Sequence, residues 1–269
     1  MTLRQVRITV LIILLVVTSS LLPIPHTLQN KLVWHESSAK LRVLFIGNSF
    51  TFGNDLPLLL EAMMWKTSLP IDTEMIAYGG VSLKWHSNND ATLEALETDH
   101  WDYVVLQDCS DCPLWRQDAF QSGVREMVRL VKKAGSEPIL FMTWADIGAF
   151  EQQKIIANEY HIIGKELDVK VVPVGLAWEA VQRTHPELRL YDGDGHHAGM
   201  LGTFVSAYTF ITVLQKRPDH VLNGAVVPPP QRFYQLLFPE EQRIYADHVT
   251  AKKIQSVVDD LSELLKRRD

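Results

Sequence analysis

Three residue types that together can activate a nucleophile occur in two distant segments of this sequence. Ser49 follows a short apolar run, Val43–Ile46, after a Gly-Asn turn. A serine hydroxyl is a poor nucleophile unless a base removes its proton. The loop Asp192–His197 supplies such a base, because Asp194 and His197 stand three residues apart in it. The carboxylate can fold back onto the ring Nδ1–H, which leaves Nε2 free to accept the proton of Ser49.

The same two segments have simpler interpretations. Ser49 alone is also typical of a turn or of a helix N-cap. The loop Asp192–His197 is also compatible with a surface turn, or with a metal cluster of two aspartates and two histidines. Asp192 and His196 form a competing acid–base pair at i, i+4. No further ligand motif accompanies the loop, so we expect no metal ion.

A serine mechanism also needs donors for the oxyanion that develops in the transition state. Gly79 and Gly80 follow the second apolar run, and a glycine lets a backbone N–H approach a substrate closely. Gln107 ends the third run with a side-chain amide donor. Taken alone, the glycines are typical of a turn and Gln107 is typical of a polar strand end.

Apolar runs and helical patterns alternate along the chain. The strand-like runs are Val43–Ile46, Ile71–Ala77, Tyr103–Gln107, Pro138–Thr143 and Val169–Val174. Helical spacing of apolar residues separates them, and an apolar helix at Leu201–Leu214 follows the histidine loop. This alternation predicts an α/β fold with a five-stranded parallel sheet and helices on both faces. Ser49, the glycines, Gln107 and the histidine loop would then meet at the carboxyl edge of the sheet.

The N-terminal segment, residues 1–30, differs from the rest. Arg4 and Arg7 precede a mostly apolar run, Ile8–Val17, which is typical of a secretory signal peptide or an N-terminal membrane anchor. No clean Ala-x-Ala site follows, and the run is near the lower length limit for a bilayer span, so cleavage and membrane attachment both stay open. We expect an exported protein whose main domain, with a C-terminal helical extension, covers residues 40–269.

The net charge bears on the possible partners, and the cysteine content bears on disulfide and metal chemistry. The net charge of −6, without a basic stripe that contains aromatics, argues against a nucleic-acid partner. Cys109 and Cys112 are the two cysteines, spaced Cys-x-x-Cys. In an exported protein this spacing predicts a local disulfide, and two cysteines alone are too few for a zinc site.

These segments resemble the blocks of the SGNH (GDSL-type) hydrolases. VLFIGNSFTF, at 43–52, is similar to the first block, whose serine is the nucleophile, here Ser49. YGGVSL, at 78–83, resembles the second block, whose oxyanion glycine maps to Gly80, with Gly79 as the alternative. DGHHAGMLG resembles the final Asp-x-x-His block, in which a glycine follows the histidine by five residues. Gly202 stands in that relation to His197, which favours His197 over His196.

The third block departs from the family pattern. DYVVLQDCSDCP stands where the family has Gly-x-Asn-Asp, and it resembles a variant subgroup in which Gln107 takes the place of the asparagine donor. The resemblance implies a flavodoxin-like three-layer α/β/α sandwich and ester hydrolysis through an acyl-enzyme on Ser49, without a cofactor. His197 would serve as base and then acid, and Asp194 would orient it. The backbone N–H of Ser49, that of Gly80 and the Gln107 amide would hold the oxyanion.

The substrate expected for an exported enzyme of this type is a carbohydrate ester, most often an acetyl ester, although a lipid or thioester stays open. Asn48, His86 and Trp144 are candidate substrate contacts. Trp85, Trp115 and Trp178 also follow strand ends, where an indole serves either as a sugar platform or as core. Two alternatives remain: a non-catalytic glycan-binding protein of the same fold, and an acyltransferase that uses the same site.

Overall fold

The computed structural model describes residues 40–64, 67, 69–215, 225–226 and 244–267, so the expected leader at 1–30 lies outside the described residues. Its centre is a parallel sheet in the order β2-β1-β3-β4-β5. The strands are β1 (Leu41–Gly47), β2 (Ile71–Ala77), β3 (Tyr103–Leu106), β4 (Glu137–Phe141) and β5 (Lys170–Val172). All adjacent pairs are parallel, which confirms the predicted five-stranded parallel sheet.

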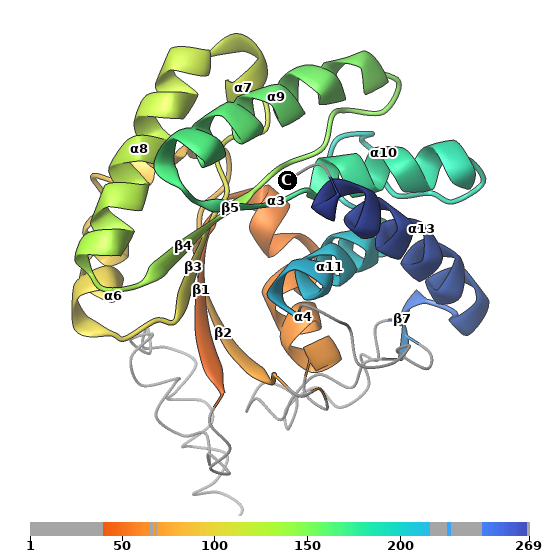
Figure 1. The fold of residues 1–269 in the computed structure, drawn as a ribbon, viewed down its shortest axis with the longest axis horizontal. Coiled ribbons are helices and arrows are strands. Elements are labelled where there is room, and N and C mark those ends of the chain that lie inside the picture. The colour runs from red at the N-terminus through yellow and green to blue at the C-terminus, as the bar shows by residue number, and fades with distance from the viewer. Residues whose placement is uncertain (1–39, 65–66, 68, 216–224, 227–243, 268–269) are drawn as a thin grey trace, which may run out of the picture. The chain divides into compact units, whose positions relative to one another are not determined.

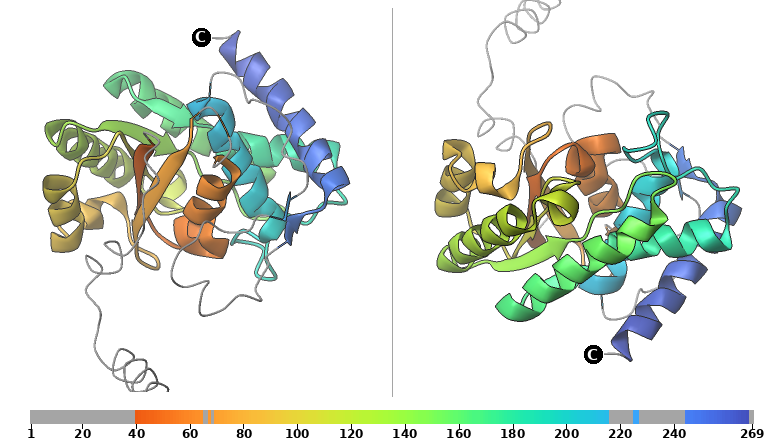
Figure 2. Two further views of the ribbon diagram at one scale, coloured as in Figure 1. Left: turned by 90° about the horizontal axis from the view of Figure 1, so that it is seen from below. Right: turned by 90° about the horizontal axis from the view of Figure 1, so that it is seen from above.

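Helices cover both faces of this sheet (Figure 1). One face carries α4 (Leu56–Met64), α10 (Val174–Thr184) and α11 (Met200–Leu214), and α13 (His248–Lys266) packs on α10 and α11 (Figure 2). The other face carries α5 (Leu83–His86), α6 (Asp90–Thr98), α8 (Gln117–Lys133) and α9 (Phe150–Leu167). Successive side chains of a strand point to opposite faces. Val43 and Phe45 therefore join the first core, while Leu44 and Ile46 join the second.

The strand order creates a crevice at the carboxyl edge of the sheet. From β1 the chain proceeds to β2 on one side and then to β3 on the other, so the order reverses between β1 and β3. In open α/β sheets ligands bind outside the carboxyl ends of the strands at such a switch point. The loops after β1 and β3, which carry Ser49 and Asp108, meet there, as do the nearby turns after β2 and β4.

Several elements differ from the sequence-based expectation. The helical segment between β2 and β3 is divided into two helices, α5 and α6, because Asn89 starts a new helix by accepting a hydrogen bond from the Thr92 N–H. Helix α10 and three short helical turns, α3 (Ser49–Phe52), η2 (Gly53–Asp55) and α7 (Cys112–Trp115), were not predicted. A short antiparallel pair, β6 (Ala225–Val226) and β7 (Ile244–Ala246), lies outside the main sheet. None of the described helices has the length and apolar character that a membrane span requires.

Candidate active site

Ser49 opens α3 directly after β1, in a turn that is held from several sides. The side-chain oxygen of Asn48 caps the helix by accepting from the Phe50 N–H at 3.1 Å. A Cβ on Gly47 would lie 2.3 Å from Thr51 Oγ1 and 2.5 Å from Gln107 Oε1. Only glycine therefore fits at the end of β1, and the chain turns sharply enough to present the Ser49 side chain at the sheet edge.

The histidine loop brings a base to this hydroxyl. His197 Nε2 lies 2.9 Å from Ser49 Oγ, and His197 Nδ1 lies 2.6 Å from Asp194 Oδ2. The other Asp194 oxygen accepts the backbone N–H groups of His196 and His197, both at 2.9 Å. The hydrogen bond from the His197 ring, together with these two N–H groups, holds the pKa of the Asp194 carboxyl below its ordinary value. The predicted Ser–His–Asp contacts are thus present, 148 residues apart in sequence between Ser49 and His197.

A stack of three aromatic rings packs beside the histidine loop and holds it. The Phe50 ring stacks on Trp144 with centroids 4.4 Å apart, and Trp144 stacks on Trp178 at 4.1 Å. Trp144 also donates its indole N–H to the carbonyl of His196 at 3.0 Å. Because Trp144 is only 2% exposed, its expected role as a substrate contact is wrong. It fixes the position of the histidine loop instead.

Two backbone N–H groups beside Ser49 are available for an oxyanion. Among the residues that the structure describes, neither the N–H of Ser49 nor that of Gly80 donates a hydrogen bond within the protein. Gly80 has φ of +70°, a conformation that favours glycine. Both residues line a cavity of about 480 Å³ together with Ser110, His196 and His197. Both N–H groups therefore remain candidates for the predicted oxyanion donors.

Gln107 occupies a different place from the one predicted. Its side chain is fully buried and is not among the residues that line the cavity. Its Oε1 accepts from the Asn48 N–H at 2.9 Å and from Thr51 Oγ1 at 2.8 Å, and its amide nitrogen donates to the Asp108 carbonyl. The Asn48 N–H can only donate, so the amide orientation is fixed. Gln107 therefore stabilises the nucleophile turn, and its complete burial away from the cavity keeps its amide from an oxyanion, which corrects its predicted role.

Two further residues that were predicted to contact substrate instead form hydrogen bonds within the protein. His86 is fully buried, with Nδ1 2.9 Å from Thr92 Oγ1 and Nε2 2.9 Å from the Gly47 carbonyl. Burial lowers the pKa of His86. Asn48 borders the cavity, but its amide N–H groups go to the carbonyls of Val81 and Asp108 at 3.0 and 3.3 Å. Both residues link the turns after β1, β2 and β3, and neither has a free polar atom to offer a substrate.

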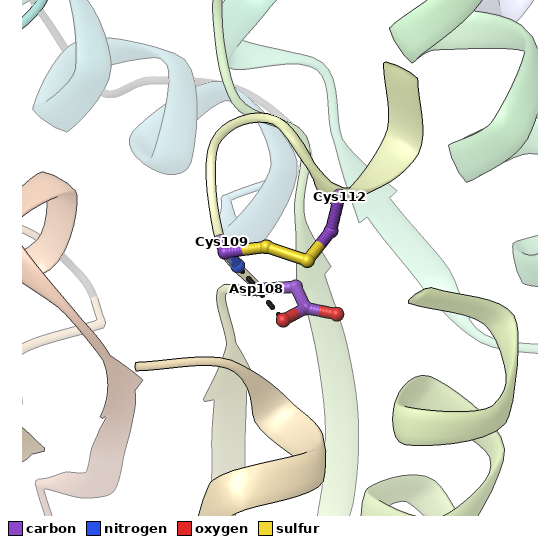
Figure 3. A group of neighbouring side chains, drawn as sticks. All are labelled: Asp108, Cys109 and Cys112. Atoms are coloured by element: carbon purple, nitrogen blue, oxygen red, sulfur yellow. Dashed lines mark hydrogen bonds between the residues drawn. A yellow bond between two sulfur atoms is a disulfide. The ribbon is translucent and has the colours of Figure 1, made fainter. Parts of the chain in front are cut away.

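The loop after β3 forms another wall of the cavity. Cys109 and Cys112 are joined by a disulfide, with Cα atoms 5.3 Å apart. Figure 3 shows this disulfide beside Asp108, whose Oδ1 accepts from the Cys109 N–H at 2.7 Å. The same oxygen accepts from the Leu83 N–H at 2.8 Å. These three side chains are close enough to resemble a metal site, but disulfide sulfurs are not thiolate ligands.

His196, which lines the same cavity, belongs to a second histidine–aspartate pair that was not predicted from the sequence. His196 Nδ1 lies 2.5 Å from Asp146 Oδ1, and His196 Nε2 lies 3.5 Å from Ser110 Oγ. The competing pair of Asp192 with His196 is absent, because an Asp192 oxygen instead accepts from the Gly193 N–H. Asp146 follows β4, so an aspartate after the fourth strand and the doublet of histidines were the available signals.

The fold of this chain is similar to that of several solved structures. No family model matches the chain, and the search of curated proteins gave no match either. Solved structures do match. A protein assigned to the SGNH hydrolases, from Slackia heliotrinireducens, has 23% identity over 65% of this chain and 100% of its own, with a TM-score of 0.57. A DUF4886 family protein from Bacteroides uniformis has 20% identity over 82% and 94%, with a TM-score of 0.57.

A third similar structure is the lipase/acylhydrolase from Enterococcus faecalis, with 12% identity over 67% of this chain and 100% of its own, and a TM-score of 0.51. These identities are low, so the likeness is one of fold. The chain has the α/β fold of the SGNH hydrolases, as the resemblance of its sequence blocks implied.

Proposed function

We propose that this protein is a serine esterase that hydrolyses an acyl ester, an acetyl ester on a carbohydrate, through an acyl-enzyme on Ser49. The observation that carries the proposal is the continuous hydrogen-bonded chain from Ser49 Oγ through His197 to Asp194, open to a cavity. The fold, which is that of known acylhydrolases, supports the same reaction class. A protein that only binds glycans would have no need of this contact geometry.

Acylation follows from the positions of the three side chains. Ser49 Oγ attacks the ester carbonyl carbon while His197 Nε2 takes its proton, and the carbonyl oxygen becomes an oxyanion. The N–H groups of Ser49 and Gly80 donate to that oxyanion. The tetrahedral intermediate collapses, the bond to the alcohol oxygen breaks, and His197 returns its proton to the departing alcohol. Asp194 stabilises the imidazolium and keeps its ring oriented.

Deacylation uses the same groups with water as the nucleophile. His197 Nε2 takes a proton from water, whose oxygen attacks the acyl carbon. The second tetrahedral intermediate breaks the bond to Ser49 Oγ, and His197 returns the proton to that oxygen. A sugar hydroxyl in place of water would give acyl transfer, and no observed contact favours that variant over hydrolysis.

The carbohydrate part of the proposal rests on the exposed aromatics. Tyr78 and Trp85 are each 42% exposed, and their rings pack edge to face with centroids 5.1 Å apart. Tyr78 follows β2 and stands two residues before Gly80. Exposed aromatic rings beside a polar site suit the apolar faces of sugars. Trp178, by contrast, is a core residue at 1% exposure. We further propose that residues 1–30 direct export, as a cleaved signal or a retained anchor, from their charge and apolar pattern alone.

Hydrolysis of p-nitrophenyl acetate by the wild type and by Ser49→Ala tests the proposed reaction. We expect Ser49-dependent turnover, because the acyl-enzyme forms on the Ser49 hydroxyl before water attacks. Equal rates in the two proteins would refute the role of Ser49. Ser136→Ala is a matched control, since Ser136 is a buried serine in the turn before β4, at the opposite edge of the sheet, and does not line the cavity.

A further inference from the structure

The second histidine of the cavity has the same arrangement as the catalytic one but a weaker contact. Both His196 and His197 bind an aspartate through Nδ1 and direct Nε2 toward a serine hydroxyl. Their rings lie edge to face with centroids 4.9 Å apart. In the mechanism proposed above His197 is the histidine that transfers protons, and His196 has no role.

Asp146 determines which hydrogen-bonding role His196 has in the cavity. An ionised carboxylate only accepts hydrogen bonds, so the 2.5 Å contact places the ring proton on Nδ1. In the neutral ring Nε2 is then an acceptor. The ring is further held by its contact with Phe50, at 4.8 Å between centroids, and by the bond from Trp144 to its carbonyl. His196 thus presents a fixed lone pair to the cavity.

The Nε2 lone pair of His196 has only one long contact among the described residues. The hydroxyl of Ser110 is 3.5 Å away, whereas O–H donors commonly lie nearer 2.8 Å from their acceptors. Both residues line the cavity that contains Ser49 and Gly80, and the His196 side chain is 35% exposed. There is therefore room for a hydroxyl from a ligand to donate to Nε2 and, in turn, to meet the Ser110 hydroxyl.

We propose that His196, held by Asp146 and joined by Ser110, is a subsite that binds a free hydroxyl on the alcohol portion of the ester. The inference rests on the proposed function: an acetyl group carries no hydroxyl, so the hydroxyl belongs to the alcohol. Substrates are then monoesters of polyhydroxylated alcohols with a free hydroxyl near the ester. His196 determines specificity, while His197 carries out proton transfer.

Two esters that differ by one methyl group and release alcohols of similar acidity test this subsite: 2-hydroxyethyl acetate and 2-methoxyethyl acetate. The methyl ether can accept a hydrogen bond but cannot donate one to Nε2. We expect the wild type to prefer the hydroxyl ester by about tenfold in kcat/KM, the value of one hydrogen bond. In His196→Ala this ratio should fall toward one, and in His196→Gln, which restores a polar atom, it should partly recover.

Asp146→Asn gives a sharper test. An asparagine amide can donate to Nδ1, which moves the ring proton to Nε2 and turns the acceptor into a donor. The ether oxygen then becomes an acceptable partner, so the preference for the hydroxyl ester should disappear while the ring stays in place. His185→Gln is the matched control, because it breaks a histidine–carboxylate pair, His185 with Glu187 at 3.4 Å, that does not line the cavity. It should keep the wild-type ratio.

The outcomes separate this inference from the proposed function. A ratio that stays at the wild-type value in both His196→Ala and Asp146→Asn would overturn the subsite, as would a wild-type ratio near one. If neither ester is hydrolysed in a Ser49-dependent manner, the proposed function fails and the subsite fails with it. Ser49-dependent hydrolysis with an unchanged ratio would overturn the subsite alone.

Discussion

Asp108 carries an unfavourable charge in the folded protein, and its replacement should show this as a pH-dependent gain in stability. The side chain is 1% exposed at the end of β3. One carboxyl oxygen accepts the N–H groups of Leu83 and Cys109, while Oδ2 is buried and has no hydrogen-bond partner among the described residues. Burial outweighs these bonds and raises the pKa of Asp108 from 3.8 to about 6.

The sign and size of the effect follow from linkage. Between pH 3.8 and about 6 the folded state binds more protons than the unfolded state, so stability falls as the pH rises. The rise in the pKa of Asp108 from 3.8 to about 6 corresponds to a loss of about 3 kcal/mol in the free energy of unfolding, complete above pH 6. Asp108→Asn keeps an oxygen for the two N–H groups and carries no charge. The variant should therefore match protonated Asp108 near pH 4 and exceed the wild type by about 3 kcal/mol at pH 7 to 8.

Urea unfolding of both proteins at intervals from pH 4 to pH 8 measures this difference. We expect the gap between the two free energies of unfolding to open between pH 4 and pH 6 and then stay constant. Parallel curves across this range would refute the reasoning, because they would mean that Asp108 titrates alike in the folded and unfolded states. A gap that opens with falling pH would show the opposite sign of pKa shift.

Three further substitutions test individual contacts. Asp194→Asn should lower kcat for p-nitrophenyl acetate by about 10³- to 10⁴-fold, because the amide favours the wrong tautomer of His197; a loss under tenfold would contradict this. Gly202→Ala should lower the free energy of unfolding by about 1–3 kcal/mol, since its Cβ would lie 2.2 Å from the Leu190 carbonyl; an unchanged Tm would disprove the clash. Gln107→Leu should destabilise the protein by about 1–3 kcal/mol, because it leaves the buried Asn48 N–H unpaired. Full stability with a 100-fold lower kcat would restore Gln107 as an oxyanion donor.

The sheet and the main relay could be predicted because they depend on local patterns. The apolar runs end within two residues of the strand ends, and the spacing of Asp194 and His197 within one loop is enough for their hydrogen bond. Ser49 reaches the same edge because parallel strands end together. Periodicity and short-range spacing thus predicted the fold, while the resemblance to the SGNH sequence blocks favoured Ser49 as nucleophile and His197 over His196.

The errors concern side chains whose roles depend on distant partners. Gln107, His86 and Trp144 all end or follow strands, as binding residues do, but each is buried and bonded to the turns that hold Ser49 or the histidine loop. The pairing of His196 with Asp146 spans 50 residues, so no local spacing indicates it. Exposure and hydrogen-bond direction decide such roles, and they follow from tertiary packing.

The central claim is that Ser49 is a nucleophile activated by His197. The most direct measurement is intact-protein mass after treatment with a fluorophosphonate, for the wild type, Ser49→Ala and His197→Ala. We predict one phosphonyl adduct on the wild type, located on Ser49 by peptide mapping, no adduct on Ser49→Ala, and at least 100-fold slower labelling of His197→Ala. Equal labelling of Ser49→Ala, or an adduct on Ser110 in place of Ser49, would contradict the account.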